Sequence, residues 1–223
     1  MSEITYDYIV QYLRALHIPS DNEVLYNIEQ SIASGKQTWP IITPEVKSLI
    51  SVLIAMNKPK QILEIGAAVG YSSIFMSGLI DGHVTTIERF DVMYEKAQKN
   101  IIAANAQDKI TILKGDAAEI LTTLNTASYD MIFMDCAKGQ YINFLPECIR
   151  LLKVGGLLIT DNVLHKGSVA KSRYSIERRQ RTTHGRLREF LWTITHCEQL
   201  VSSVIPIGDG VSLSYKVEEA RHE

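Results

Sequence analysis

Two segments of the chain combine glycine and acidic residues in a way that would hold a nucleoside. Residues 63–72 read LEIGAAVGYS, an apolar strand followed by a glycine turn and the start of a helix, and a later apolar segment ends in Glu88. In a doubly wound sheet the backbone at such a turn packs against the ligand, and the acid binds the ribose hydroxyls. The glycines have Gly-x-x-x-Gly spacing, without the Gly-x-Gly-x-x-Gly of pyrophosphate sites. A nucleoside without phosphates is therefore favoured, and S-adenosylmethionine fits best.

Glu88 and Asp116 also have a structural interpretation, which the sequence leaves open. As ligands, Glu88 would bind the ribose, while Asp116 and Ala117 would face the adenine. As structural residues, Glu88 would be an acid at a helix N-terminus, and Asp116 would be the N-cap of the helix that follows Gly115. The glycine turn upstream favours the ligand interpretation of Glu88.

Oxygen-bearing side chains follow two further apolar runs. Asp135 ends the run at 130–134, and Asp161 with Asn162 ends the run at 156–160. Two carboxylates and an amide at neighbouring strand ends suit Mg²⁺, which prefers octahedral oxygen coordination. Alternatively, Asp161 and Asn162 only start a loop, as such residues often do. The three together favour a metal site.

Lys138 lies three residues beyond Asp135 and is the candidate general base. An ammonium beside a divalent cation and a reacting oxygen would have its pKa lowered, which suits proton abstraction. The alternative is an ordinary solvated lysine at a helix start.

The elements that must position these residues follow from the hydrophobic pattern. Helical periodicity predicts three helices first, at 5–17, from Asp21 or Asn22 to Gly35, and around 46–54. Between the last two lies a loop at 37–44 that two prolines restrain. Short apolar runs then alternate with helical segments, which indicates βαβ units and a parallel sheet with helices on both faces. The predicted strands are 61–65, 83–88, 110–114, 130–135, 156–161, 200–206 and 211–217. Residues 208–210, Gly-Asp-Gly, predict a hairpin that makes the last strand antiparallel.

Composition and length bound the class of protein. The chain has 223 residues, of which 46% are hydrophobic and 22% charged, so one globular domain with a substantial core is expected. The three cysteines have no CxxC spacing, which argues against a disulfide framework or a structural zinc and favours a reducing cytoplasm. No segment has the pattern of a secretory signal or approaches the ~18 apolar residues of a membrane span. A cytoplasmic protein without membrane contact is predicted.

In their order along the chain, these motifs resemble the metal-dependent class I O-methyltransferases of the catechol and caffeoyl-CoA group. The matching residues are 64–66, 70–72, 88, 115–117, 135–141 and 161–164, so the likeness covers nearly the whole chain. It implies an α/β fold, with a Rossmann-like, doubly wound, seven-stranded and mostly parallel sheet whose last strand is antiparallel. Residues 1–57 would form an N-terminal helical cap on a core at 58–223. Homodimers are common in the family, and the apolar N-terminal helices could supply the interface.

The resemblance also implies roles for individual residues. S-adenosylmethionine would be the methyl donor, Asp135, Asp161 and Asn162 would hold Mg²⁺, and Lys138 or the metal would activate the acceptor hydroxyl. Asp135 and Lys138 are the expected catalytic residues. The expected cofactor contacts are Ile42, Thr43, Glu64, Gly66, Ala67, Gly70, Ser72, Glu88, Arg89, Asp116, Ala117 and Asp135.

A basic segment follows the predicted metal ligands. Residues 165–188 contain eight lysines and arginines and a single acid, Glu177, which is the pattern of a surface that binds a polyanion. The alternative is the solvated face of an amphipathic helix whose apolar face includes Leu187, Phe190 and Leu191. The candidate tRNA contacts are Lys166, Lys171, Arg173, Arg178, Arg179 and Arg181.

The same segment resembles the bacterial tRNA 5-hydroxyuridine methyltransferases of this family. That likeness predicts methylation of 5-hydroxyuridine at the wobble position, U34, to 5-methoxyuridine, with a tRNA anticodon loop as partner. The 5-hydroxyl and 4-carbonyl of that base form an adjacent oxygen pair that could chelate Mg²⁺ as a catechol does. Two alternatives remain: a small-molecule O-methyltransferase for catechol or caffeoyl-CoA-like acceptors, and a non-catalytic RNA-binding module.

Overall fold

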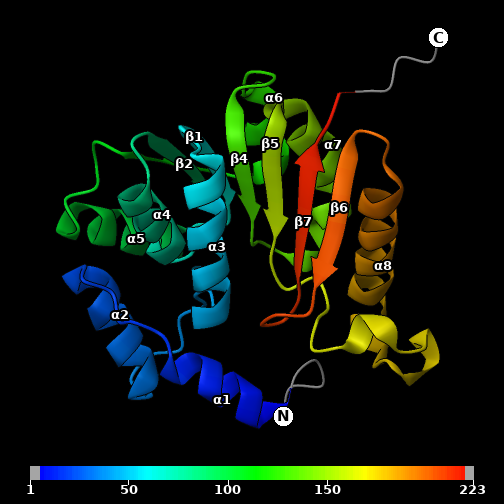
Figure 1. Cartoon of the computed structure of the whole chain (residues 1–223), viewed down its shortest axis with the longest axis horizontal. Coiled ribbons are helices and arrows are strands. Elements are labelled where there is room, and N and C mark those ends of the chain that lie inside the picture. The colour runs from blue at the N-terminus through cyan, green and yellow to red at the C-terminus, as the bar shows by residue number, and fades with distance from the viewer. Residues whose placement is uncertain (1–5, 219–223) are drawn as a thin grey trace.

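A computed structural model describes residues 6–218 and contains one seven-stranded sheet (Figure 1). The strands are β1 (Gln61–Ile65), β2 (His83–Glu88), β3 (Ile110–Lys114), β4 (Tyr129–Met134), β5 (Leu152–Thr160), β6 (Leu200–Ile205) and β7 (Val211–Lys216). Their order is β3-β2-β1-β4-β5-β7-β6. All neighbouring pairs are parallel except those of β7, which runs antiparallel to both β5 and β6. The predicted fold class is confirmed, including the antiparallel last strand.

Eight α-helices accompany the sheet within the described residues. They are α1 (Asp7–Ala15), α2 (Glu23–Ala33), α3 (Pro44–Asn57), α4 (Tyr71–Leu79), α5 (Asp91–Ala103), α6 (Ala117–Thr123), α7 (Tyr141–Leu151) and α8 (Arg181–His196). The side chains of α2 to α5 contribute to one buried apolar cluster, and those of α6 to α8 to a second. The sheet therefore carries helices on both faces, as the alternating pattern predicts.

The third helix belongs to the core of the sheet domain. Val46, Ile50 and Ile54 of α3 are buried against the same cluster as Met131 and Phe133 of β4. In contrast, α1 buries none of its residues. No helix within residues 6–218 is long and apolar enough to cross a membrane.

β5 begins earlier than the predicted strand at 156–161. It starts at Leu152 and passes through Gly155, which has φ +83°, and the register with β4 shifts between Tyr129 and Met131. Two consecutive glycines interrupt the apolar run and produce an irregular strand start, which a pattern of apolar residues does not reveal.

The order of strands reverses beside β1, which has β2 on one side and β4 on the other. The chain goes outward from β1 to β3 and then returns to β4. In open α/β sheets the crevice at this reversal, beyond the carboxyl ends of the strands, is where ligands bind. The residues after β1, β2, β4 and β5 meet at this edge.

Candidate functional site

The turn after β1 leaves room only for glycine at its first position. Gly66 has φ +106°, and a Cβ there would lie 2.3 Å from the carbonyl oxygen of Asp135. Gly70, with φ +80°, precedes the first residue of α4, and a Cβ there would lie 3.3 Å from Ala97. The turn thus lets β1 and the end of β4 approach closely, and its backbone faces the crevice.

A cavity of about 470 Å³ lies at this edge of the sheet. Nine of the twelve predicted cofactor contacts line it: Ile42, Gly66, Ala67, Ser72, Glu88, Arg89, Asp116, Ala117 and Asp135. Asn162, from the predicted metal set, also lines it. Thr43, Glu64 and Gly70 do not line the cavity, and neither do Lys138 and Asp161.

Glu64 lies beneath the glycine turn after β1 and makes hydrogen bonds to the elements around it. Its carboxylate is fully buried and accepts hydrogen bonds from the hydroxyls of Ser73 and, at 2.6 Å, Thr86. Burial raises the pKa of the Glu64 carboxyl to about 7, although the hydroxyl donors around it act in the opposite direction. Glu64 therefore connects β1, β2 and α4 beneath the cavity wall.

Glu88 combines both of its predicted interpretations. One carboxylate oxygen accepts the backbone N–H of Ala68 at 2.9 Å, and the other accepts the N–H of Phe90 at 2.8 Å. Each oxygen keeps a further lone pair, and the side chain lines the cavity. Glu88 thus fixes the glycine turn and can still accept hydrogen bonds from a ligand.

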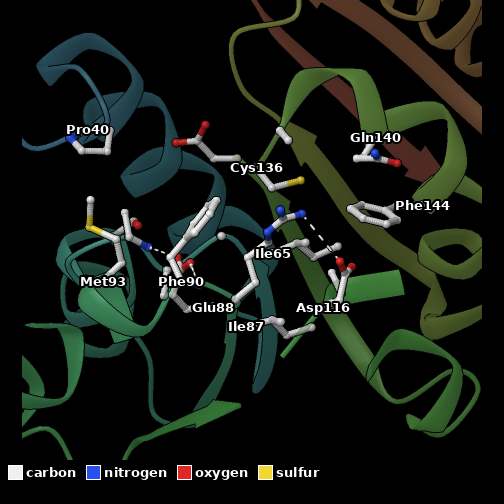
Figure 2. Close-up of a pocket in the computed structure, with 18 of the residues that line it drawn as sticks. Pro40, Ile65, Ile87, Glu88, Phe90, Met93, Asp116, Cys136, Gln140 and Phe144 are labelled. Atoms are coloured by element: carbon white, nitrogen blue, oxygen red, sulfur yellow. Dashed lines mark hydrogen bonds and ion pairs between the residues drawn. The ribbon is translucent and has the colours of Figure 1, made fainter. Parts of the chain in front are cut away.

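Asp116 also has both features. It is the N-cap of α6 and accepts the N–H of Ala118 at 2.9 Å, as the structural interpretation predicts. Its other oxygen lies 3.6 Å from the guanidinium of Arg89, and both residues line the cavity (Figure 2).

Several lining residues lie outside the twelve named cofactor contacts. Figure 2 shows Phe90 and Met93 with Glu88 on one side of the cavity, and Gln140 and Phe144 on the other. The cavity is also lined by Pro40, Ile41, Tyr71 and Cys136. Most of these side chains stand in loops or first helical turns, where an apolar residue has no periodic signal that separates a ligand contact from ordinary packing.

The predicted metal ligands lie at the ends of adjacent strands. Asp135 follows β4 and Asp161 follows β5, and Asp161 is only 2% exposed. Burial raises the pKa of both carboxyls; the charge of Asp135 raises that of Asp161 further, and the charge of Lys138 lowers that of Asp135. Asn162 has φ +56°, a left-handed conformation that asparagine tolerates. Within residues 6–218 no group of three or more His, Cys, Asp or Glu side chains is placed to hold a metal. The predicted set contains two carboxylates and one amide.

Lys138 contacts a residue that the sequence did not single out. Its ammonium lies 3.5 Å from Oδ2 of Asp209, in the turn between β6 and β7, and both side chains are largely buried. Lys138 itself starts a short 3₁₀ turn, Lys138–Gln140, after β4. The expected position close to Asp135 is consistent with the effect of its charge on that carboxyl.

The basic segment is mostly a chain of short turns. Three 3₁₀ turns, Ser168–Ala170, Arg173–Ser175 and Arg178–Gln180, precede α8, so an amphipathic helix accounts only for Arg181, Arg186 and Arg188. The exposed members of the candidate set are Lys166, Lys171, Arg173, Arg178 and Arg179. Arg181 is half-buried and donates to the carbonyl of Ile176 at 3.0 Å. In Figure 1 this segment lies at the same end of the sheet as α1.

Comparison with known proteins gives consistent results. A family model described as O-methyltransferase matches residues 17–217. A catechol O-methyltransferase from Niastella koreensis is 30% identical over 154 residues, which are 67% of this chain and 70% of that protein. A solved caffeoyl-CoA O-methyltransferase candidate from Staphylococcus aureus is 34% identical, with a TM-score of 0.81, over 94% of this chain and 97% of that one. An O-methyltransferase from Bacillus cereus, solved in complex with SAH, has the same fold at 23% identity, with a TM-score of 0.80 over 94% and 97% of the two chains.

Proposed function

The chain belongs to the O-methyltransferase family, and from this premise we propose that it transfers a methyl group from S-adenosylmethionine to one of two adjacent oxygens of a small acceptor, with Mg²⁺. The single observation that carries the proposal is the cavity at the reversal of strand order. The glycine turn, the Glu88 carboxylate and Asp135 all face it. The binding of SAH by the Bacillus cereus protein of the same fold supports the choice of donor.

The residues present fit a magnesium ion. Asp135, Asp161 and Asn162 offer only oxygen atoms, and the two carboxylates are buried where their ionised forms are unfavourable without a compensating charge. When bound there, Mg²⁺ would act as a Lewis acid that lowers the pKa of the acceptor hydroxyl.

The chain's own residues have three tasks in this proposal. Glu88 accepts hydrogen bonds from the ribose hydroxyls, and Phe90, Met93 and Phe144 exclude water from the donor. Lys138, as the neutral amine, takes the proton of the acceptor hydroxyl at its Nζ atom and becomes the ammonium. The backbone of the glycine turn holds the methionine portion of the donor so that the methyl group faces the acceptor.

A small acceptor of the catechol or caffeoyl-CoA type is the better supported choice, because the relatives carry those names. The test is transfer of labelled methyl groups to a free catechol, with and without EDTA. EDTA-sensitive product is expected, and Asp135→Ala should reduce turnover about 100-fold or more while donor binding, measured by calorimetry, persists. Asp108→Ala, an exposed acid elsewhere, is the control. Full activity of Asp135→Ala would contradict the metal assignment.

A second acceptor, the wobble 5-hydroxyuridine of tRNA, is favoured by one observation. Five exposed cations, Lys166, Lys171, Arg173, Arg178 and Arg179, lie on or beside the 3₁₀ turns that follow the predicted metal ligands, and Arg179 pairs with Glu177 at 2.8 Å. tRNA carrying unmethylated 5-hydroxyuridine belongs in the same assay, with the nucleosides read by mass spectrometry. Appearance of 5-methoxyuridine at lower substrate concentration than the catechol product would make tRNA the acceptor. If the catechol is methylated and the tRNA stays unmodified, the acceptor is the small molecule.

A further inference from the structure

The turn between β6 and β7 packs against residues that are next in sequence to the cavity-lining Ile42 and Asn162. In Figure 1 it lies between the lower end of α3 and the segment that follows β5. The N–H of Val163 donates to the carbonyl of Gly210 at 2.9 Å, and the N–H of Leu164 donates to that of Asp209 at 3.0 Å. These bonds attach the turn to the two residues that follow the predicted metal ligand Asn162.

Both glycines of the turn have a positive φ and approach a neighbouring element closely. Gly210 has φ +87°, and a Cβ there would lie 2.4 Å from Cγ of Leu164. Gly208 has φ +57°, and a Cβ there would lie 3.1 Å from Thr43 and Val46. Asp209 is therefore held on a rigid turn between the start of α3 and the loop after β5.

The Asp209 carboxylate links two parts of the site. Oδ2 lies 3.5 Å from Nζ of Lys138, and Oδ1 accepts the backbone N–H of Lys166. The Asp209 side chain is 20% exposed and that of Lys138 is 27% exposed, so water screens the pair only in part. One carboxylate thus connects the predicted general base to the first cation of the basic segment.

Asp209 is not part of the predicted metal set. Its negative charge acts on Asp161 and His165, but within the described residues the acids near the site do not form a group of three that could hold a metal. Its direct side-chain contact at the site is with Lys138. Any effect on the reaction must then pass through the position of that ammonium or of the loop at Lys166.

We propose that Asp209 is a positioning residue that holds Nζ of Lys138 in one place after β4 and fixes the loop at Lys166 relative to it. The proposal rests on the function proposed for Lys138. The carboxylate restricts a long, flexible side chain to one direction, which lowers the entropic cost of aligning it with the acceptor hydroxyl.

The test uses Asp209→Asn, which keeps the size of the side chain and an oxygen for the Lys166 N–H but removes the ion pair. We expect kcat to fall at least tenfold, with the KM for S-adenosylmethionine within twofold of wild type and an unchanged melting temperature. In a Lys138→Met background the same substitution should change kcat less than twofold, because its effect needs the Nζ atom of Lys138. Asp209→Glu should recover part of the lost kcat.

Asp81→Asn is the matched control, since it removes a carboxylate paired with Lys60 at the exposed surface and should leave the kinetics unchanged. Equal effects of Asp209→Asn with and without Lys138 would overturn the proposal, and so would a lowered melting temperature that accounts for the loss. An increased Mg²⁺ requirement would also overturn it, because the residue would then act on the metal. If Lys138→Met keeps full activity, the role proposed for Lys138 fails as well; if Lys138→Met is inactive and Asp209→Asn is normal, only the role of Asp209 fails.

Discussion

At the scale of single residues, Glu64 has the most direct consequence for stability. Its pKa rises to about 7 in the folded protein because it is buried beneath the glycine turn, so the folded state binds more protons than the unfolded state between pH 4.5 and about 7. The free energy of unfolding must then decrease as pH rises through that interval.

Glu64→Gln should remove this contribution, which amounts to about 3 kcal/mol for the shift cited. Urea unfolding at pH 5, 6 and 7 in the presence of EDTA measures it in both proteins. Asp135 and Asp161 are present in both proteins, so the difference in slope measures Glu64 together with its charge interaction with Asp135. The same slope for wild type and variant would show that Glu64 is not protonated in the folded protein.

Several of the predicted cofactor contacts that line the cavity stand at the ends of strands. Glu88 ends β2, whereas Gly66, Asp116 and Asp135 come after β1, β3 and β4, and the parallel sheet brings all four to one edge. Lys138 and Asp209 meet although they are 71 positions apart. Nothing in their local patterns signals that contact, because it depends on β7 being inserted beside β5.

At the scale of elements, glycine has opposite effects in the turn after β1 and inside α8. Gly66→Ala would place a methyl group against the backbone of Asp135, at a φ that L residues rarely adopt. The expected loss of stability is at least about 2 kcal/mol, with loss of donor binding. Gly185 lies within α8 and has open space around it, so Gly185→Ala should stabilise the protein by about 0.5–1 kcal/mol. Urea unfolding measures both.

A stable Gly66→Ala protein that still binds S-adenosylmethionine would refute the close approach of β1 to the end of β4. The Gly185→Ala variant controls for the effect of a methyl group on the unfolded chain, which is common to both substitutions.

The elements with strong periodicity were predicted nearly to the residue. β1, β2 and β3 have the predicted bounds, and α2 begins after Asn22, whose side chain accepts the N–H of Val24 at 3.0 Å. The secondary structure of residues 165–180 does not follow from the sequence, because a series of cations without periodic apolar residues fits either a helix face or a loop. Arg188 and Arg186 turn inward to backbone carbonyls, which composition alone does not indicate.

At the scale of the whole molecule, the salt dependence of tRNA binding tests whether the basic segment contacts tRNA. Replacement of Arg173, Arg178 and Arg179 by alanine should weaken tRNA binding and reduce the slope of log K against log salt by about 2, if all three contact phosphates. Replacement of Lys58, Lys60 and Lys99, exposed cations outside the basic segment, is the matched control. Filter binding of tRNA at salt concentrations from 50 to 200 mM measures the slopes of log K against log salt. Equal slopes for both triple variants would make the basic segment a solvated surface.

The exposed apolar side chains of α1 predict that the protein forms a homodimer. It has no buried residue, and Tyr8, Tyr12 and Leu16 at or beside it are each more than 60% exposed. We expect the protein to sediment at twice the 25.1 kDa of one chain, and Tyr8→Asp with Tyr12→Asp to sediment as single chains. Val92→Asp, an equally exposed apolar residue on α5, is the control. A wild-type protein that sediments at 25.1 kDa would refute the expected homodimer.

The insertion of β7 between β5 and β6 also determines when the molecule becomes complete during synthesis. β6 leaves the ribosome before β7, yet within residues 6–218 its only neighbour in the sheet is β7. A nascent chain that ends before residue 211 has no partner for β6, and its Gly208–Gly210 turn is not yet closed against Leu164. The donor cavity can form from β1 to β4 earlier, whereas the acceptor side is assembled last. A growing chain could therefore acquire its donor before it is able to use it.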